Sequence, residues 1–336
     1  MFEGKVEMSS IPKQIHVFIA RLRKQHQANP LLFWLRVAVL GFITYLFTVK
    51  HNFWTPDTLF VLLLGVFVVF GQARAFLYRF APFIALLLVY DSFRSIADQL
   101  NRSVHYTEMV HADHALFAGI LPTAWLQHVL WHGQVQWYDF YFYFLYTMHF
   151  VAPILLAVLI WKQCDRLYWP FVTALIGLSF AAFITFVLFP AAPPWLASNQ
   201  GYIAPIHRIS SDIWQAMGVT NFSQLYNSIS PNPVAAVPSL HAAYPLLFVL
   251  FLSNMYGWRR VWWAMVYPIS VWLGVVYLGE HYAIDVLLGA VYALAAYYTT
   301  LYLFAFKEQR GWQVRRSIRA VALNLWAQAR RAWPSG

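Results

Sequence analysis

Two histidines and one aspartate form the pattern in this sequence with the clearest chemical meaning. His241 ends a Pro-Ser-Leu-His motif that begins at Pro238, and His281 and Asp285 enclose a His-Tyr-Ala-Ile-Asp motif. Residues four apart share one face of a helix, so the carboxylate of Asp285 can hold the imidazole of His281. Two histidines, one of them oriented by an acid, suit a phosphoryl transfer through a phosphohistidine. One histidine attacks phosphorus and the other protonates the leaving oxygen.

Two apolar runs between these motifs indicate how the histidines would meet. The runs lie at about 243–256 and 261–279, and a short basic turn separates them. Two hydrophobic helices joined by such a turn return the chain to the side that it left. The hairpin therefore predicts that His241 and His281 lie at the same face of a membrane. Ionisable residues inside an apolar span are costly, which favours a functional role for His281 and Asp285.

The composition is that of a membrane protein. Apolar residues make up 60% of the chain, aromatic residues 19% and charged residues only 11%, whereas soluble domains have about 25% charged residues. Several runs reach the ~20 apolar residues that a bilayer span needs. The single cysteine, Cys164, cannot form an internal disulfide. We therefore expect an all-α, polytopic membrane helix bundle that has no nucleic-acid partner, although the net charge is +10.

The apolar runs predict about eight transmembrane helices, of which the last six form the core. The expected spans are 31–49, 57–73, 76–91, 138–161, 167–189, 239–256, 261–279 and 284–306, and the second and third could form one broken re-entrant unit. The expected parts are a basic cytoplasmic tail at 1–30, a transmembrane hairpin at 31–75, a catalytic core at 76–306 and a basic cytoplasmic tail at 307–336. The last tail is either an amphipathic helix on anionic lipid or disordered.

The distribution of Lys and Arg predicts the orientation of these spans. Of the 23 Lys and Arg residues, 18 lie in the two tails and the even-numbered turns, and four lie on the other side. Cytoplasmic segments are enriched in Lys and Arg, so both termini should be cytoplasmic. The histidine motifs then lie on the outer face, although they played no part in the count. The short loops suit a bacterial plasma membrane, and in a eukaryote this face would be the Golgi lumen.

Two long outer segments invite a functional interpretation. The first, at about 92–137, contains Asp113 and five histidines whose role the sequence leaves open: His105, His111, His114, His128 and His132. It could be an interfacial helical cap, or a wall of a headgroup pocket in which Asp113 binds substrate hydroxyls. A metal site is disfavoured because adjacent ligands on a helix diverge, and we expect no metal and no cofactor. The second segment, 201–238, is a plausible lid.

The two histidine motifs resemble those of the type-2 phosphatidic acid phosphatase superfamily, whose members carry Pro-Ser-Gly-His and His-x3-Asp. The resemblance is closer to the branch that contains fungal inositol phosphorylceramide synthase and sphingomyelin synthase. It covers roughly residues 85–300, and includes a Phe-Pro-Ala-Ala-Pro-Pro-Trp motif at 189–195. The resemblance implies that His281 is the nucleophile, Asp285 its orienting base, and His241 the acid toward the leaving alcohol.

Several further residues are predicted to bind substrate. Ser239 would bind phosphate oxygens together with backbone amides at the helix start, although it could be an ordinary N-cap, and a nucleophilic role for it lacks a base at a matching spacing. The resemblance implies that the proline-rich motif forms a wall of the site, whereas the simpler interpretation is a helix stop. Arg94 could bind phosphate or only reach the membrane interface. The predicted substrate-binding residues are Ser239, Arg94, Asp91, Trp195, Pro194, Asp113, Tyr282 and Arg208.

Departures from the family pattern indicate the kind of substrate. Phe189, Ala182 and Val275 stand where family phosphatases carry cations, Gly274 replaces a serine, and Leu240 replaces a glycine. A phosphomonoester carries nearly two negative charges and a diester carries one, so a cation-poor site suits a diester.

We therefore expect transfer of a phospho-headgroup, with inositol phosphate as the best guess, from a glycerophospholipid to a lipid alcohol within the membrane. One alternative is a metal-independent lipid phosphatase or phospholipase C that uses water as the acceptor. The other is a transporter or scaffold without activity. Oligomeric state is not readable from the sequence.

Overall fold

The protein is helical throughout the part that the structure describes. The computed structural model describes residues 10–50, 56–218 and 232–306, which contain isolated β-bridges but no longer strand. This confirms the predicted all-α class. The predicted C-terminal tail and the middle of the predicted lid segment lie outside the described residues.

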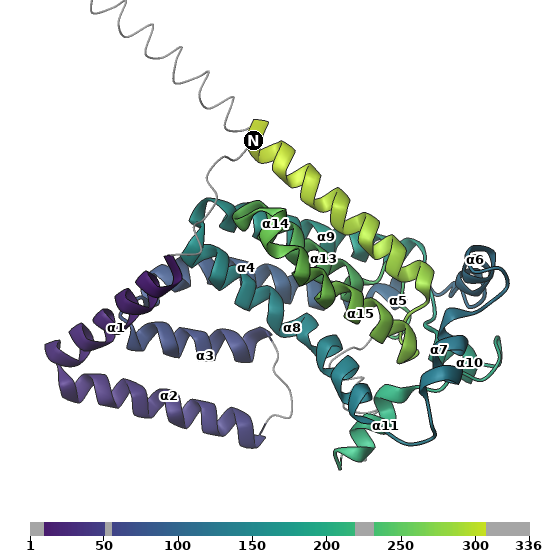
Figure 1. The fold of residues 1–336 in the computed structure, drawn as a ribbon, viewed down its shortest axis with the longest axis horizontal. Coiled ribbons are helices and arrows are strands. Elements are labelled where there is room, and N and C mark those ends of the chain that lie inside the picture. Colours follow the sequence, from purple (N-terminus) through teal and green to yellow (C-terminus); the bar gives the residue numbers. More distant parts are fainter. Residues whose placement is uncertain (1–9, 51–55, 219–231, 307–336) are drawn as a thin grey trace, which may run out of the picture.

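The helices follow one another with short connections (Figure 1). In chain order they are α1 (Ser10–Ala28), α2 (Pro30–Lys50), α3 (Pro56–Val69), α4 (Ala73–Arg94), α5 (Ala97–Leu100), α6 (Glu108–Leu116), α7 (Pro122–Leu130), α8 (Trp137–Gln163), the 3-10 turn η1 (Asp165–Leu167), α9 (Tyr168–Leu188), α10 (Pro194–Asn199), α11 (Ile209–Ala216), α13 (Leu240–Tyr256), α14 (Trp258–Val261), η2 (Trp262–Met265), α15 (Val266–Tyr277) and a last helix, Ala283–Phe306.

Four helices in these ranges are long and apolar enough to cross a membrane, namely α4, α8, α9 with the turn before it, and the last helix. The number becomes five if α1 and α2, which are bent by 119° at their junction, are one broken span. The chain is therefore an integral membrane protein. The α3 and α13 helices are apolar but shorter, so the total of eight spans stays a prediction.

One predicted span differs clearly from the structure. The stretch 261–279 is divided among the end of α14, the 3-10 turn η2 and the 12-residue α15. The break begins at Gly257, whose φ of +87° ends α13 in a backbone conformation that favours glycine. The predicted hairpin still forms, because α13 and α15 pack against each other.

Aromatic side chains fill the core of the bundle. Phe76 and Phe80 of α4 stack with ring centroids 4.5 Å apart, and Phe80 lies 5.5 Å from the ring of Tyr168 at the start of α9. All three side chains are buried. Since burying one large apolar side chain stabilises a fold by about 1.5–3 kcal/mol, this cluster fixes α4 against α9.

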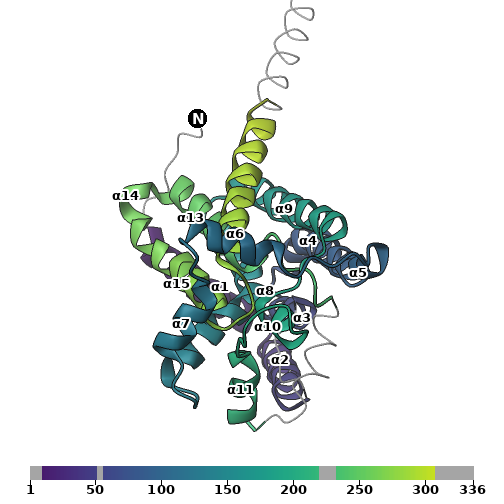
Figure 2. The ribbon, with the colours of Figure 1, turned by 90° about the vertical axis from the view of Figure 1, so that its right-hand side faces the viewer.

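The two ends of the bundle differ in character. At one end Arg79 pairs with Asp165 at 3.0 Å, and the hydroxyl of Tyr168 donates to the carbonyl of Arg79. At the other end the short helices α6, α7, α10 and α11 gather across the bundle (Figures 1 and 2). The α13 helix, which carries His241 in its first turn, begins at this second end. The short helices therefore lie around the predicted catalytic residue His241.

Candidate active site

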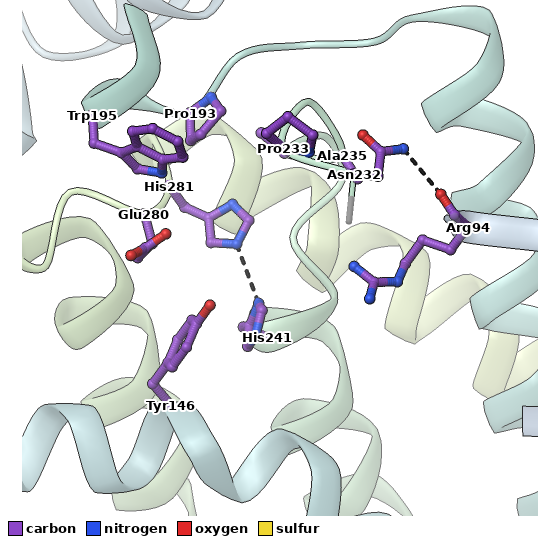
Figure 3. A pocket seen from close by; sticks show the side chains of 11 residues that line it. Arg94, Tyr146, Pro193, Trp195, Asn232, Pro233, Ala235, His241, Glu280 and His281 are labelled. Atoms are coloured by element: carbon purple, nitrogen blue, oxygen red, sulfur yellow. Dashed lines mark hydrogen bonds between the residues drawn. The ribbon is translucent and has the colours of Figure 1, made fainter. Parts of the chain in front are cut away.

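The two predicted catalytic histidines meet at the end of the bundle that the short helices cover. Nδ1 of His241 lies 3.3 Å from Nε2 of His281, and Nδ1 of His281 lies 3.5 Å from Oδ2 of Asp285 (Figure 3). His281 is only 6% exposed and Asp285 is fully buried. The hairpin thus brings together three residues that lie up to 44 positions apart in the sequence. His241 faces His281, and His281 faces Asp285.

The way in which His281 and Asp285 meet differs from the prediction. They do not share a helix face, because the last helix begins at Ala283, after His281. Oδ2 of Asp285 instead accepts a hydrogen bond of 2.9 Å from the amide of Tyr282. The carboxylate therefore binds back over the first turn of its own helix, and this places it beside the His281 ring.

This geometry prepares one nitrogen of His281 for attack. A carboxylate that faces Nδ1 favours the tautomer in which Nδ1 carries the proton and Nε2 keeps its lone pair. Nε2 is the atom that faces His241 and the pocket. His281 can therefore act as a nucleophile and His241 as an acid or a base, within the reach of a single phosphoryl group.

The Pro238–His241 turn is fixed directly to the last helix. Ser239 is the N-cap of α13, where its Oγ accepts from the amide of Ala242 at 3.3 Å, and its own amide donates to the carbonyl of Asp285 at 3.0 Å. Its side chain is buried and does not line the pocket. The structure thus agrees with the N-cap interpretation, while the predicted contact of Ser239 with phosphate stays a prediction.

A glycine makes this contact between the turn and the last helix possible. A Cβ at Gly289 would clash with the backbone carbonyl of Ser239, whereas Gly177 in α9 has no neighbour within 4 Å of the same position. We expect Gly289→Ala to lower the free energy of unfolding by about 1–3 kcal/mol, because backbone must move to admit the methyl group.

Thermal unfolding in detergent measures this effect, with Gly177→Ala as the matched control. The control should be neutral or slightly stabilising, since alanine favours a helix interior. Equal unfolding temperatures for the two variants would contradict the close approach.

The proline-rich motif is held by backbone hydrogen bonds from three other segments. The amide of His105 donates to the carbonyl of Pro190 at 2.8 Å, and the amide of Ala191 donates to the carbonyl of Val234 at 2.9 Å. The amide of Trp195 donates to the carbonyl of Gly279 at 3.1 Å. These bonds place Trp195 beside the segment that leads to His281, so the motif does more than end α9.

A pocket opens directly above the two histidines, with about 390 Å³ of empty space including its open side. The cavity volume itself is about 60 Å³, well below the ~300–1,000 Å³ of small-molecule sites. Figure 3 shows Arg94 across the pocket from Glu280 and Trp195, with its guanidinium directed toward the histidines. The lining residues are Arg94, Tyr146, Pro193, Trp195, Asn232, Pro233, Ala235, Ala236, His241, Glu280 and His281.

One wall of the pocket contains an ion pair between Glu280 and Arg208, which lies against the ring of Trp195. Glu280 accepts hydrogen bonds from Arg208, at 3.0 and 3.3 Å, and from the hydroxyl of Ser210 at 2.5 Å. The guanidinium of Arg208 also lies 3.8 Å from the ring centre of Trp195. The predicted residue Arg208 is therefore at the site, but it neutralises Glu280 and covers a face of Trp195.

Four other predicted substrate-binding residues do not line this pocket. The side chain of Asp91 is 57% exposed and pairs with Arg94 at 3.1 Å. Pro194 and Tyr282 are buried beside lining residues. Asp113 is buried, and both of its oxygens accept hydrogen bonds from backbone amides. In the structure these residues support others that face the pocket.

The sequence analysis missed three polar residues that line the pocket. Glu280 directly precedes His281, and an acid in an apolar run next to a predicted nucleophile is a signal that could have identified it. Tyr146 stacks on the ring of His241 with centroids 4.2 Å apart, and Asn232 donates to the carbonyl of Arg94 at 3.1 Å. Neither has a local signal, because each meets the site only through tertiary packing.

The positions at which family phosphatases carry cations are buried or tightly packed here, which disfavours a charged side chain. Ala182 and Val275 are fully buried, and the ring of Phe189 stacks on His105 with centroids 3.8 Å apart. A Cβ at Gly274 would lie 2.9 Å from Phe142. Arg94 is the one cation among the lining residues that the structure describes.

The histidines and the acid of α6 are not grouped as metal ligands would be. Within the described ranges no three His, Cys, Asp or Glu side chains are arranged to hold a metal ion. The α6 helix lies at one end of the bundle (Figure 1), and its interpretation as an interfacial cap stays a prediction.

Comparison with known proteins gives a family and two relatives. A sequence model described as the PAP2 superfamily matches residues 107–299, more than half of the chain. A phosphoinositol dihydroceramide synthase of Bacteroides thetaiotaomicron is 28% identical over 225 residues, which are 63% of this chain and 72% of that protein. An inositol phosphorylceramide synthase of Candida albicans is 29% identical over 181 residues, which are 49% of this chain and 36% of that protein. No solved structure matches the chain.

Proposed function

We propose, because this chain belongs to the PAP2 superfamily, that it transfers a phosphorylated headgroup from a glycerophospholipid to the hydroxyl of a lipid acceptor. At the coarser level the chain is a membrane-bound lipid phosphotransferase of this superfamily, like its relatives. The observation that carries the finer proposal is the contact of 3.3 Å between His241 and His281, with Asp285 behind His281.

In the first step Nε2 of His281 attacks the phosphorus of the donor. The bond between phosphorus and the diacylglycerol oxygen breaks, and that oxygen takes a proton from His241. Diacylglycerol leaves, and the headgroup phosphate stays bound to His281 as a phosphohistidine. The hydrogen bond between the rings gives way to the phosphoryl group, as catalytic contacts rearrange when substrate binds.

In the second step His241, now neutral, accepts the proton of the acceptor hydroxyl. The acceptor oxygen attacks phosphorus, the nitrogen–phosphorus bond breaks, and His281 is regenerated. Asp285 stabilises the positive charge that develops on the His281 ring and keeps Nδ1 protonated. Both steps use the same two histidines. His281 is first the nucleophile and then the leaving group, and His241 is first the acid and then the base, which suits a transferase.

The charge of the pocket supports a diester donor. Arg94, which pairs with the exposed Asp91 at its outer side, is the cation directed toward the histidines (Figure 3), and the single charge of Glu280 is balanced by Arg208. One cation matches the single negative charge of a phosphodiester better than the charge of nearly two on a monoester. A closely packed ionic partner is most favourable when the charges balance.

The pocket also favours a headgroup with hydroxyl groups over one with a quaternary ammonium. Cation recognition uses open aromatic faces. Here Arg208 lies over Trp195, and Tyr146 stacks on His241. Glu280 already pairs with a cation, but carboxylate and guanidinium groups together can bind hydroxyls. This supports an inositol phosphate headgroup, which the names of both relatives also contain.

The proposed setting follows from the arrangement of charge along the bundle. The pocket lies at the end covered by α6, α7, α10 and α11, and the basic turn at Arg259 and Arg260 lies at the other end of α13. Basic turns favour the cytoplasmic side. We therefore place the site on the outer face of the plasma membrane, with the acceptor entering from the bilayer.

Acceptor dependence tests the proposal. Purified protein in mixed micelles receives phosphatidylinositol or phosphatidylcholine labelled with ³²P, with EDTA present, and with or without ceramide, diacylglycerol or a polyprenol. We expect label in a new lipid only when an acceptor is present, and more from phosphatidylinositol than from phosphatidylcholine. A water-soluble labelled product formed equally without acceptor would make the protein a hydrolase. Transfer from phosphatidylcholine alone would overturn the headgroup assignment.

A further inference from the structure

A buried carboxylate from a distant segment caps the helix that follows His281. Asp113 lies in α6 and is 0% exposed. Its Oδ1 accepts from the amide of Ile284 at 2.8 Å, and its Oδ2 accepts from the amide of Ala283 at 3.0 Å. These amides belong to the first two residues of the last helix, 170 and 171 positions away along the chain.

The last helix needs this cap because its own sequence does not supply one. The first amides of a helix have no partner within the helix, and a preceding Ser, Thr, Asp or Asn normally accepts from them. Here the helix follows His281 and Tyr282, neither of which has a short oxygen acceptor at that place. Asp113 supplies the missing acceptor from α6.

Each backbone amide from His281 to Ile284 then has a defined partner. The amide of His281 donates to the carbonyl of Val275 at 3.1 Å, and the amide of Tyr282 donates to Asp285 at 2.9 Å. Asp113 binds the remaining two. The backbone on both sides of His281 is therefore fixed, by Val275 before it and by the two carboxylates after it.

We propose that Asp113 is a positioning residue for the transfer reaction, which holds His281 and Asp285 in register through the first turn of the last helix. Asp285 reaches His281 only while this turn is formed, because the carboxylate is held there by the amide of Tyr282. A misplacement of about 1 Å at a reacting group can reduce the rate on the order of 100-fold. This inference rests on the proposed function only because its test measures the turnover of a phospholipid.

The chemistry of the cap adds a dependence on pH. Burial raises the pKa of Asp113 to about 6, and the nearby Asp285 adds to this, while the two amide bonds and His114 oppose it. Protonation replaces one acceptor oxygen with a hydroxyl and so weakens the cap. The other titratable group that faces Asp113 is Tyr282.

Asp113→Asn tests the proposal, because the amide keeps the size of the side chain but offers a donor where an acceptor is needed. We expect kcat to fall at least about tenfold with KM nearly unchanged, since the helix start moves but the pocket wall does not. Asp139→Asn is the matched control. Asp139 is also a buried helix-capping aspartate, and it accepts from the amide of Gln136 and from the hydroxyl of Tyr277. The control should lower the unfolding temperature without this loss of kcat.

A double-mutant cycle with Asp285→Asn separates positioning from general stability. If Asp113 acts through Asp285, adding Asp113→Asn to the Asp285→Asn protein should reduce the residual rate less than about threefold, because interacting sites are not additive. Fully additive losses would overturn the proposal. So would a kcat for Asp113→Asn equal to that of the wild type.

The pH profile gives a second readout that a purely structural role would not move. The ratio of kcat between wild type and Asp113→Asn should be largest above pH 7 and should fall as the pH decreases through about 6. Titrating groups that do not interact with Asp113 cancel in this ratio, whereas Asp285, His114 and Tyr282 interact with it. A ratio that stays constant between pH 5 and 8 would contradict the role of the ionised carboxylate.

A second variant, which removes a backbone amide that donates to Asp113, keeps the test valid if Asp113→Asn does not fold. Ala283→Pro removes one of the two amide donors at the first helical position, where proline is tolerated. We expect a smaller fall in kcat in the same direction, and unchanged kcat would overturn the proposal. Any phospholipid that the wild type turns over serves for these comparisons. Turnover without a lipid product would therefore reject the transferase but leave this test intact.

Discussion

His281→Ala is expected to abolish turnover, with a loss of at least about 10⁴-fold, because the residue is proposed to form the covalent intermediate. His241→Ala should lose about 10²–10⁴-fold on a natural phospholipid, since it removes an acid that protonates the leaving alcohol. The two variants should differ sharply on a donor with a 4-nitrophenol leaving group and the same headgroup phosphate. That leaving group needs no proton, so the first step of His241→Ala, measured as the initial burst of 4-nitrophenol, should recover to within about tenfold of the wild type, while the second step stays slow because it still lacks its base.

The measurement compares the rates of the first step on both donors, taken from the burst of released alcohol, and acid-labile, base-stable label on the protein reports the phosphohistidine. His281→Ala should remain inactive on both donors and carry no label. His128→Ala is a suitable control, since His128 is an exposed histidine of α7 outside the pocket. If His241→Ala lost equal activity on both donors, the role of His241 as the acid would be rejected. Turnover by His281→Ala would reject the nucleophile.

Asp285→Asn is expected to have the second-largest effect, a fall in kcat of about 10²–10⁴-fold with a small change in KM. One oxygen, Oδ2, both accepts from the amide of Tyr282 and faces Nδ1 of His281. An asparagine oxygen at that place keeps both contacts but carries no negative charge. The positive charge that develops on the His281 ring is then not balanced, which slows both proposed steps.

Steady-state kinetics in mixed micelles, together with the unfolding temperature, check this prediction. Asp285→Ala serves as a comparison, because alanine removes the charge and both contacts of Oδ2. Alanine should therefore be at least as inactive as asparagine. An Asp285→Asn protein that kept more than about a tenth of the wild-type kcat would contradict the proposed role of the charge.

The proposals for the histidines and for Asp113 make one connected picture. In these proposals the donor phosphate meets His281, whose ring faces Asp285, and Asp113 caps the helix turn that carries Asp285. The acceptor oxygen is proposed to meet His241, on whose ring Tyr146 stacks. A rigid site of this kind lets one pocket serve two successive steps with different alcohols, because only the alcohol has to exchange.

Much of the fold was predictable from apolar runs, and the exceptions have a local cause. Each predicted span overlaps helical structure, since a helix satisfies its own backbone groups inside a membrane. Their lengths were less predictable. The run at 261–279 looked continuous, yet it includes a 3-10 turn. Average hydrophobicity does not record which part of an apolar run keeps regular hydrogen bonds.

The sequence by itself determined that two histidines and an acid would lie at one end of a membrane hairpin, because helix length and a short basic turn force the chain to return. Only the tertiary structure decided how they meet. His281 lies before the last helix and not on it, Glu280 is bound by Arg208, and Asp113 caps the helix from α6. The physical reason is that unpaired amides and buried charges take whichever partner packing brings near, and for Ala283 and Ile284 that partner is 170 residues away.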